Sequence, residues 1–219
     1  MKIKILLLIL TFFAINSFAQ VQKFPDGVYL NLNQLRNQTP AFNIKLRVIK
    51  RTSGDITMNG GNDYKLESVI DSINKRYIKK NIFAYVKDDS IFLNCIHNKL
   101  TSWYSLCLTK GNFLVFKTNV PDDNAAMYGV MFGAIGGAIA GAVDAQKRYL
   151  YVLSLRTGNA RPLGKVYLTA RLEENQDLLE QYNNEKNQDS ETILLKYIDL
   201  LNKIITPTSA PASSEPKSK

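Results

Sequence analysis

A glycine recurs at every fourth position through an uncharged stretch, 125–143, and this pattern restricts what the middle of the chain can build. The glycines are Gly129, Gly133, Gly137 and Gly141. In a helix they would lie near one face, where the missing Cβ lets another backbone approach closely. Three alternatives follow: a small-residue helix packed on its own domain, a glycine zipper for self-association or membrane contact, and an irregular loop.

A single membrane span over this stretch is disfavoured, although a straight helix of its length would measure about 28 Å, close to the bilayer thickness. Most of its residues are Gly and Ala, which contribute little transfer energy. A span would also separate the strands expected before 125 from those expected after 148. We therefore expect a Gly/Ala-rich helical insertion, 125–145, within one sheet.

The N-terminus, 1–19, has the pattern of a secretory signal peptide. Lys2 and Lys4 precede an apolar centre, and a small-x-small pattern ends at Ala19. Cleavage is expected between Ala19 and Gln20. No cysteine follows the expected cut, so a lipid-anchored class is not supported. The sequence predicts an exported protein that is periplasmic, associated with the cell envelope, or secreted.

The chain is basic, with a formal net charge of +9. Its basic residues gather in two clusters: Lys45, Arg47, Lys50 and Arg51, and then Lys75, Arg76, Lys79 and Lys80. Such clusters attract anionic lipid headgroups, polyanionic glycans or nucleic acid. We favour solvated strand and loop faces over a specific site. Export, and the lack of an aromatic-interleaved nucleic-acid motif, argue against nucleic acid as a partner.

The alternation of apolar residues predicts a single α+β domain over 20–205 with a mainly antiparallel sheet. A short strand, 28–30, is followed by a helical turn that Asn31 caps, and 44–49 alternates as a strand. Two hairpins are expected in the middle of the chain: 82–86 with 91–93, and 103–108 with 113–117. Further strands are expected at 149–155 and 166–168.

Two amphipathic helices are expected to close the domain, at 171–182 and 190–205, because their apolar residues recur with helical spacing. The last residues, 206–219, are rich in Pro, Ser, Ala and Lys. Such a segment cannot bury enough apolar surface to order itself, and we expect a disordered tail.

Cys95 and Cys107 are the two cysteines, and an oxidising compartment permits them to pair. If 90–96 and 102–109 form a hairpin that turns about Thr101, the two residues lie directly opposite and within disulfide range. The alternative is two small, buried and reduced strand residues. The sequence leaves both open.

No catalytic, cofactor or metal site is recognisable. His97 is the sole histidine, which rules out an imidazole cluster for zinc. We expect it to be an exposed polar residue in a hairpin turn. The pairs Asp88-Asp89 and Asp122-Asp123 lie in expected turns and lack the pattern of a calcium loop. We therefore expect no enzyme activity and no cofactor.

A set of short motifs along the chain carries a family resemblance. The motifs lie at 24–30 with 37–40, at 78–80 with 82–85, at 111–116, at 151–153 with 157–158, and at Tyr197-Ile198 with Leu201-Asn202. Together they resemble an uncharacterised family of exported Bacteroidetes proteins, a domain of unknown function. The resemblance covers nearly all of the chain between the signal peptide and the tail. It implies export and supplies no catalytic residues.

Three classes of function follow. The preferred one is an exported, non-enzymatic module that binds or scaffolds a component of the cell envelope or periplasm. The second is a membrane-associating or self-associating protein that acts through the glycine zipper. The third is an enzyme whose site is assembled from residues distant in the sequence.

Overall fold

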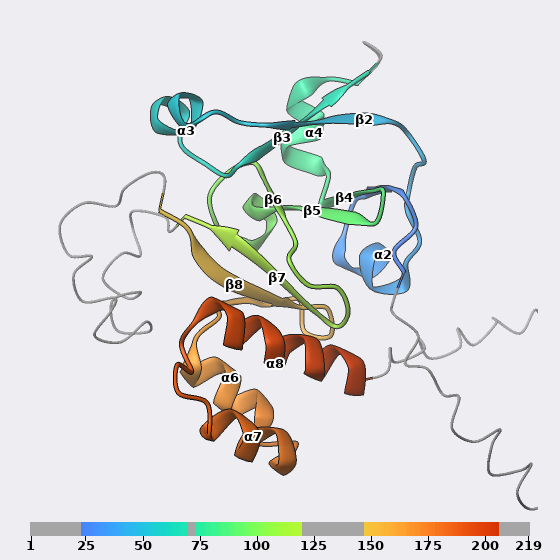
Figure 1. Cartoon of the computed structure of the whole chain (residues 1–219). Helices are drawn as coiled ribbons and strands as arrows, with labels where there is room; N and C mark the ends of the chain where they lie inside the picture. Colours follow the sequence, from blue (N-terminus) through green and yellow to red (C-terminus); the bar gives the residue numbers. More distant parts are fainter. Residues whose placement is uncertain (1–22, 70–72, 120–146, 206–219) are drawn as a thin grey trace, which may run out of the picture.

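A computed structural model describes residues 23–69, 73–119 and 147–205, which form an α+β fold with two antiparallel sheets (Figure 1). The expected fold class is therefore confirmed. The expectations for the signal peptide with its Ala19–Gln20 cut, for the glycine-rich insertion, for Asp122-Asp123 and for the tail fall outside the described residues.

The larger sheet has six strands in the order β1-β4-β5-β6-β3-β2, all of whose pairings are antiparallel. The strands are β1 (Gly27–Tyr29), β2 (Leu46–Lys50), β3 (Tyr64–Ser68), β4 (Ala84–Lys87), β5 (Ser90–Asn94) and β6 (Tyr104–Leu106). The sheet is curled, so that its two edges approach each other. The Leu46 backbone N–H donates to the Tyr85 hydroxyl at 3.0 Å, although three strands separate β2 from β4 in the sheet order.

The hairpin between β4 and β5 is present as expected. Its turn contains Asp88 and Asp89, which both have positive φ, 48° and 61°. Two consecutive residues of this kind form the turn whose twist matches a two-residue hairpin, and Asp tolerates that conformation better than most residues.

The smaller sheet contains β7 (Phe113–Thr118), β8 (Tyr149–Ser154) and β9 (Ala160–Pro162). Phe113 pairs with Ser154 and Thr118 pairs with Tyr149, so β7 and β8 are antiparallel neighbours along their whole length. The chain between 119 and 148 thus connects adjacent ends of two paired strands. The expectation that the strands flanking the glycine-rich stretch belong to one sheet is confirmed.

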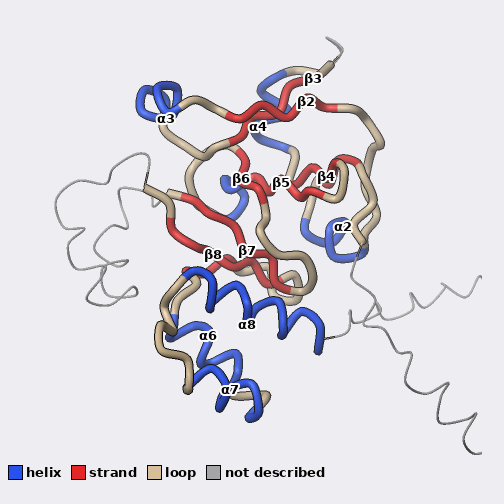
Figure 2. Tube along the Cα trace, in the orientation of Figure 1, coloured by secondary structure: helices blue, strands red, loops and turns tan. Residues whose placement is uncertain are grey.

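Three helices pack on one face of the smaller sheet (Figures 1 and 2). They are α6 (Lys165–Leu172), α7 (Gln176–Asn183) and α8 (Glu191–Ile204). The strand expected at 166–168 is wrong, because these residues begin α6. The helix expected over 171–182 is two helices, since the chain breaks after α6 and Asn175 caps the start of α7 by accepting from the Leu178 N–H.

The remaining helices lie against the larger sheet: α2 (Leu32–Asn37), α3 (Ser53–Asn59), α4 (Lys75–Asn81) and the 3₁₀ turn η1 (Cys95–Asn98). Asn31 caps α2 as expected. Strand β3 and helix α4 were not anticipated. The second expected hairpin is only partly right: β6 and β7 belong to different sheets and are linked by an isolated bridge between Cys107 and Phe116.

The core has three parts. One cluster lies between the two sheets, a second lies between the smaller sheet and α6, α7 and α8, and a third lies on the concave face of the curled sheet beneath α4. Among the described residues, none of the helices is long and apolar enough to cross a membrane.

Candidate functional site

The two cysteines are free thiols, and the register that would have paired them is wrong. Leu93 pairs with Ser105, and the Cys95 N–H donates to the Trp103 carbonyl at 3.1 Å. The connection is centred on Lys99 and not on Thr101, so the backbone partner of Cys95 is Trp103, four residues away from Cys107. Of the two alternatives left open, the structure contains the buried, reduced pair.

Burial raises the pKa of both thiols. The pKa of Cys95 rises to about 12, and burial together with the nearby Cys95 raises the pKa of Cys107 further. Thiolates are the nucleophilic and metal-binding form of cysteine. Neither residue can supply one near neutral pH in this environment.

The other titratable residues noted in the sequence stand apart from one another. His97 lies exposed in η1, as expected, and its ring packs against that of Phe83 with centroids 5.6 Å apart. Partial burial lowers the pKa of His97. Over 23–69, 73–119 and 147–205, no three His, Cys, Asp or Glu side chains are grouped so as to hold a metal ion.

The two basic clusters differ in their surroundings. In the first, Arg47 forms a salt bridge with Glu67 at 3.2 Å, while Arg51 has a fully buried side chain. The second cluster lies on helix α4 and not on the strand or loop face that we expected. Arg51 of the first cluster and Lys79 of the second both lie against the Trp103 ring.

Arg51 holds the loop that contains α3. Its guanidinium donates to the Asp55 carboxylate at 2.8 Å, to the Gly60 carbonyl at 2.7 Å and to the Asn62 carbonyl at 2.8 Å. The hydrogen bond from Arg51 lowers the pKa of Asp55 to about 2. Buried Arg51 is therefore a structural clamp, and its charge is largely balanced within the loop.

Trp103 lies between this clamp and α4. The Arg51 guanidinium carbon is 5.2 Å from the indole centroid, and the Lys79 ammonium is 4.4 Å from it. Both distances are within the range of cation–π attraction. Trp103 has φ of +76°, which is rare for a bulky residue. Such a conformation persists only where the surrounding structure holds it.

Hydrogen bonds join the turn beside Trp103 to the segment 61–63, and join that segment to Arg148. The Asn62 N–H donates to the Ser102 carbonyl at 2.9 Å, next to the indole. Arg148, at the start of β8, donates twice to the Asp63 carboxylate, at 2.7 and 2.9 Å. The turn beside Trp103 is thus bonded to the segment 61–63, which Arg148 connects to the start of β8.

Helix α4 presents the second basic cluster to solvent, and we call its four side chains the α4 basic surface: Lys75, Arg76, Lys79 and Lys80. No salt bridge joins any of them to an acidic side chain in the part of the chain that the structure describes. Lys79 and Lys80 lie in the last turn, where the helix dipole favours cations.

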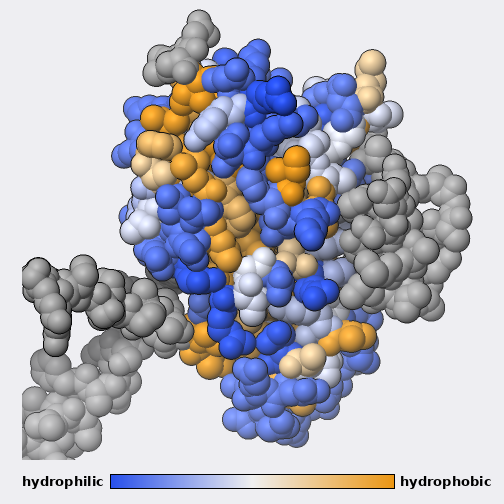
Figure 3. All heavy atoms as spheres, turned by 180° about the vertical axis from the view of Figure 1, so that it is seen from behind, coloured by the Kyte–Doolittle hydropathy of each residue, from blue (hydrophilic) through white to orange (hydrophobic). Residues whose placement is uncertain are grey.

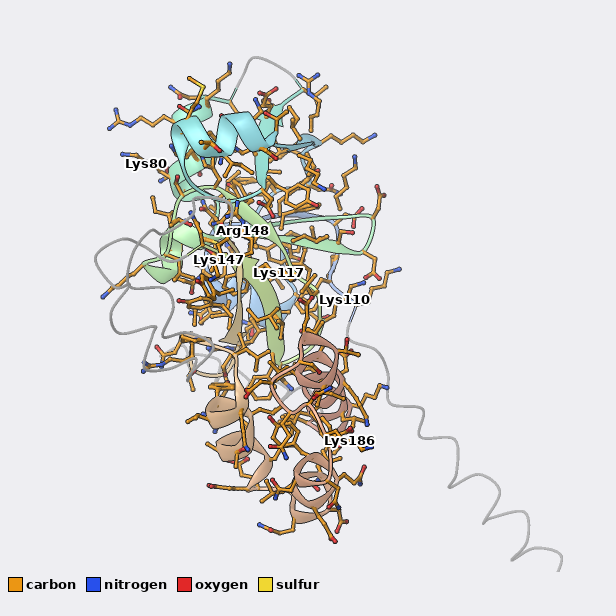
Figure 4. All side chains as sticks on the ribbon, turned by 60° about the vertical axis from the view of Figure 1, so that its left-hand side comes forward. Lys80, Lys110, Lys117, Lys147, Arg148 and Lys186 are labelled. Carbon is orange, nitrogen blue, oxygen red and sulfur yellow. The ribbon has the colours of Figure 1, made fainter. Side chains whose placement is uncertain are left out.

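Some basic side chains elsewhere on the molecule have acidic partners. Figure 4 shows Lys80 near one end of the molecule and Lys186 near the other, with Lys117 and Arg148 between them. Lys117 forms a salt bridge with Glu191 at 2.8 Å, and Arg148 forms one with Asp63. The basic side chains that gather at the α4 end suit an anionic ligand, although Lys75 is near enough to help lower the pKa of Glu67, after Lys65 and Arg47.

The sequence identified the basic residues of this site but not Trp103. It is the single tryptophan of the chain, which was the one available signal. A positive φ at a bulky residue has no sequence signature, and neither does the contact between residues 51, 79 and 103.

Among the motifs that carry the family resemblance, 78–80 contributes Lys79 and Lys80 to the α4 basic surface, and the others make contacts elsewhere in the fold. A Cβ at Gly27 would lie 2.9 Å from the Pro40 side chain, and one at Gly158 would lie 2.7 Å from Leu32. Asn202 accepts from the Phe113 N–H at 2.8 Å and donates to the Phe113 carbonyl at 2.9 Å. These contacts of the other motifs stabilise the fold.

Comparison with known proteins identifies the family of this chain, and the function of that family is unknown. Neither the curated proteins nor the solved structures include a match. A model described as a family of unknown function, DUF6563, matches residues 27–205, and the chain therefore belongs to that family.

Proposed function

We propose that this protein is an exported, non-enzymatic binding module that holds an anionic component of the cell envelope on the α4 basic surface. One observation carries the proposal: four basic side chains share a seven-residue helix, and the described residues provide no salt bridge for any of them. Trp103 holds one of the four, Lys79, in place.

The charge pattern of α4 is unfavourable for the helix alone. Lys75 and Lys79 are separated by four residues, and so are Arg76 and Lys80. Like charges at this spacing destabilise a helix by about 0.2–0.5 kcal/mol per pair. An anion bound across both pairs would remove this repulsion.

Two further observations support binding over catalysis. The cysteine thiols are buried with raised pKa values, and the sole histidine lies in an exposed turn without an acidic partner among the described residues. The basic net charge of +9 favours attraction of an anionic partner at long range.

The test is binding of the chain from Gln20 onward to fluorescently labelled heparin, a soluble sulfated glycan, measured by anisotropy over a range of salt concentrations. Replacement of all four residues of the α4 basic surface by Gln should weaken binding at least about tenfold and flatten its salt dependence, because fewer counterions are displaced.

A matched control removes the same charge at the other end of the molecule, through R161Q, K165Q, K186Q and K203Q. These four residues are exposed and form no salt bridge among the described residues. The control should bind nearly as well as the parent protein. Equal losses in the two variants would show that net charge alone drives binding and would contradict the proposal.

A further inference from the structure

Exposed apolar side chains lie beside the α4 basic surface. Val69 follows β3 and is 65 % exposed, and Tyr77 on α4 is 39 % exposed. Val69 is four positions before Ile73, which packs on the core beneath α4, so the two Cα atoms are at most about 14 Å apart. Both exposed side chains therefore lie at the α4 end of the molecule.

The four basic positions occupy one side of α4, and Tyr77 lies beyond one edge of them. At about 100° per residue, the four basic positions cover an arc of roughly 140°, and positions 77 and 78 lie about 60° beyond its two edges. Ile78 is buried there, whereas Tyr77 is partly exposed. Seen from behind, the surface shows an apolar stripe that runs alongside a strongly hydrophilic area (Figure 3). Ile44 and Val48 of the β2 segment, both partly buried, pack against the same core cluster.

We propose that the anionic component is a lipid surface, on which the α4 basic surface contacts the headgroups and Val69 and Tyr77 enter the interface. This inference rests on the proposed function and names its partner. A soluble polyanion would contact the basic side chains and leave the neighbouring apolar side chains in water. An anionic membrane accommodates both the basic and the apolar side chains. The basic residues bind its surface charge, and the exposed apolar residues, aromatic ones in particular, partition into the headgroup region.

The experiment uses the chain from Gln20 onward and vesicles of phosphatidylcholine, with and without phosphatidylglycerol. Trp103 is the single tryptophan and lies against Lys79, so its emission reports binding, and co-sedimentation measures the amount bound. We expect binding to the anionic vesicles only. It should fall at least about 100-fold when the four residues of the α4 basic surface are replaced by Gln.

The apolar contribution is tested with V69S/Y77S, against V166S/I204S as the matched control. Val166 and Ile204 are 78 % and 52 % exposed and lie on α6 and α8, in the layer of helices on the smaller sheet. V69S/Y77S should reduce vesicle binding about three- to tenfold and leave heparin binding unchanged, whereas V166S/I204S should change neither.

The outcomes separate this inference from the proposed function. Heparin binding that depends on α4, without vesicle binding, would overturn the lipid inference and leave the proposed function intact. Vesicle binding that is insensitive to V69S/Y77S would also overturn the inference, because headgroup charge alone would account for it. Absence of both kinds of binding would overturn both proposals.

Discussion

At the scale of single residues, Gly61 is required for the position of Trp103. It has φ of +83°, and a Cβ built there would lie 2.5 Å from the indole and 2.7 Å from the Ser102 carbonyl oxygen. Gly54, seven residues earlier in α3, has open space around it and an ordinary φ. The two positions therefore respond oppositely to the same substitution.

We expect Gly61→Ala to lower the free energy of unfolding by more than about 1 kcal/mol, because both the backbone and the contact with Trp103 are strained. Gly54→Ala should raise it by about 0.5–1 kcal/mol, since alanine is the better helix former. Urea denaturation of the two variants measures both values. Similar values for the two would mean that the turn beside Trp103 does not depend on glycine.

The buried thiols give a second residue-scale prediction. Because burial raises the pKa of Cys95 to about 12 and that of Cys107 beyond it, both remain protonated at pH 8. Iodoacetamide should leave the native protein unmodified and alkylate both residues after unfolding, as mass spectrometry would show. An unfolded protein that resists alkylation until a reductant is added would instead reveal a disulfide.

At the scale of elements, the Asn202 side chain connects α8 to β7 by hydrogen bonds to the strand backbone. Asn202 makes both hydrogen bonds to the backbone of Phe113, and a Cβ at Gly111 would lie 2.5 Å from the Asn202 side chain. The Asn112 side chain also donates to the Ile205 carbonyl at 2.7 Å. Two motifs separated by about ninety residues in the chain thus form one contact.

Asn202→Ala should lower the free energy of unfolding by about 1–3 kcal/mol, because the Phe113 N–H loses the Asn202 acceptor and the Phe113 carbonyl keeps only the Thr109 hydroxyl of its two side-chain donors, in a partly buried site. The control is Asn183→Ala on exposed α7, which should change stability by less than about 0.5 kcal/mol. Thermal and urea unfolding give both values. A small effect at Asn202 would show that water replaces its hydrogen bonds.

The connection between β7 and β8 gives a prediction for the glycine-rich stretch. Since Thr118 and Tyr149 are paired, a short Gly/Ser linker in place of 125–143 should leave a folded protein with an unchanged circular dichroism spectrum. A change from oligomer to monomer on deletion, measured by analytical ultracentrifugation, would favour self-association through the glycines. Unfolding on deletion would identify the stretch as part of the core.

At the scale of the whole molecule, charge and apolar surface are distributed unequally. Lys117 and Arg148, beside the smaller sheet, have acidic partners, whereas the four residues of the α4 basic surface gather on one helix and form no such pair within the described ranges. The face that carries α4 also carries exposed Val69 and Tyr77. This asymmetry is the physical basis of both proposals.

Local sequence patterns were sufficient to predict the elements that depend on a few neighbouring residues. The Asp88-Asp89 hairpin, the Asn31 cap and the paired strands on either side of the glycine-rich stretch follow from turn chemistry, capping and alternation. The same patterns misplaced 166–168, because a short apolar run fits a strand or a helix until its packing partner is known.

Long-range contacts decided the rest. Three features depend on residues far apart in the chain. They are the register that separates Cys95 from Cys107, the division of β6 and β7 between two sheets, and the contacts of Arg51 and Lys79 with Trp103. The basic character of the site could be seen in the sequence because charge is a property of composition. Its position beside Trp103 and the exposed apolar side chains could not, since folding alone brings those segments together.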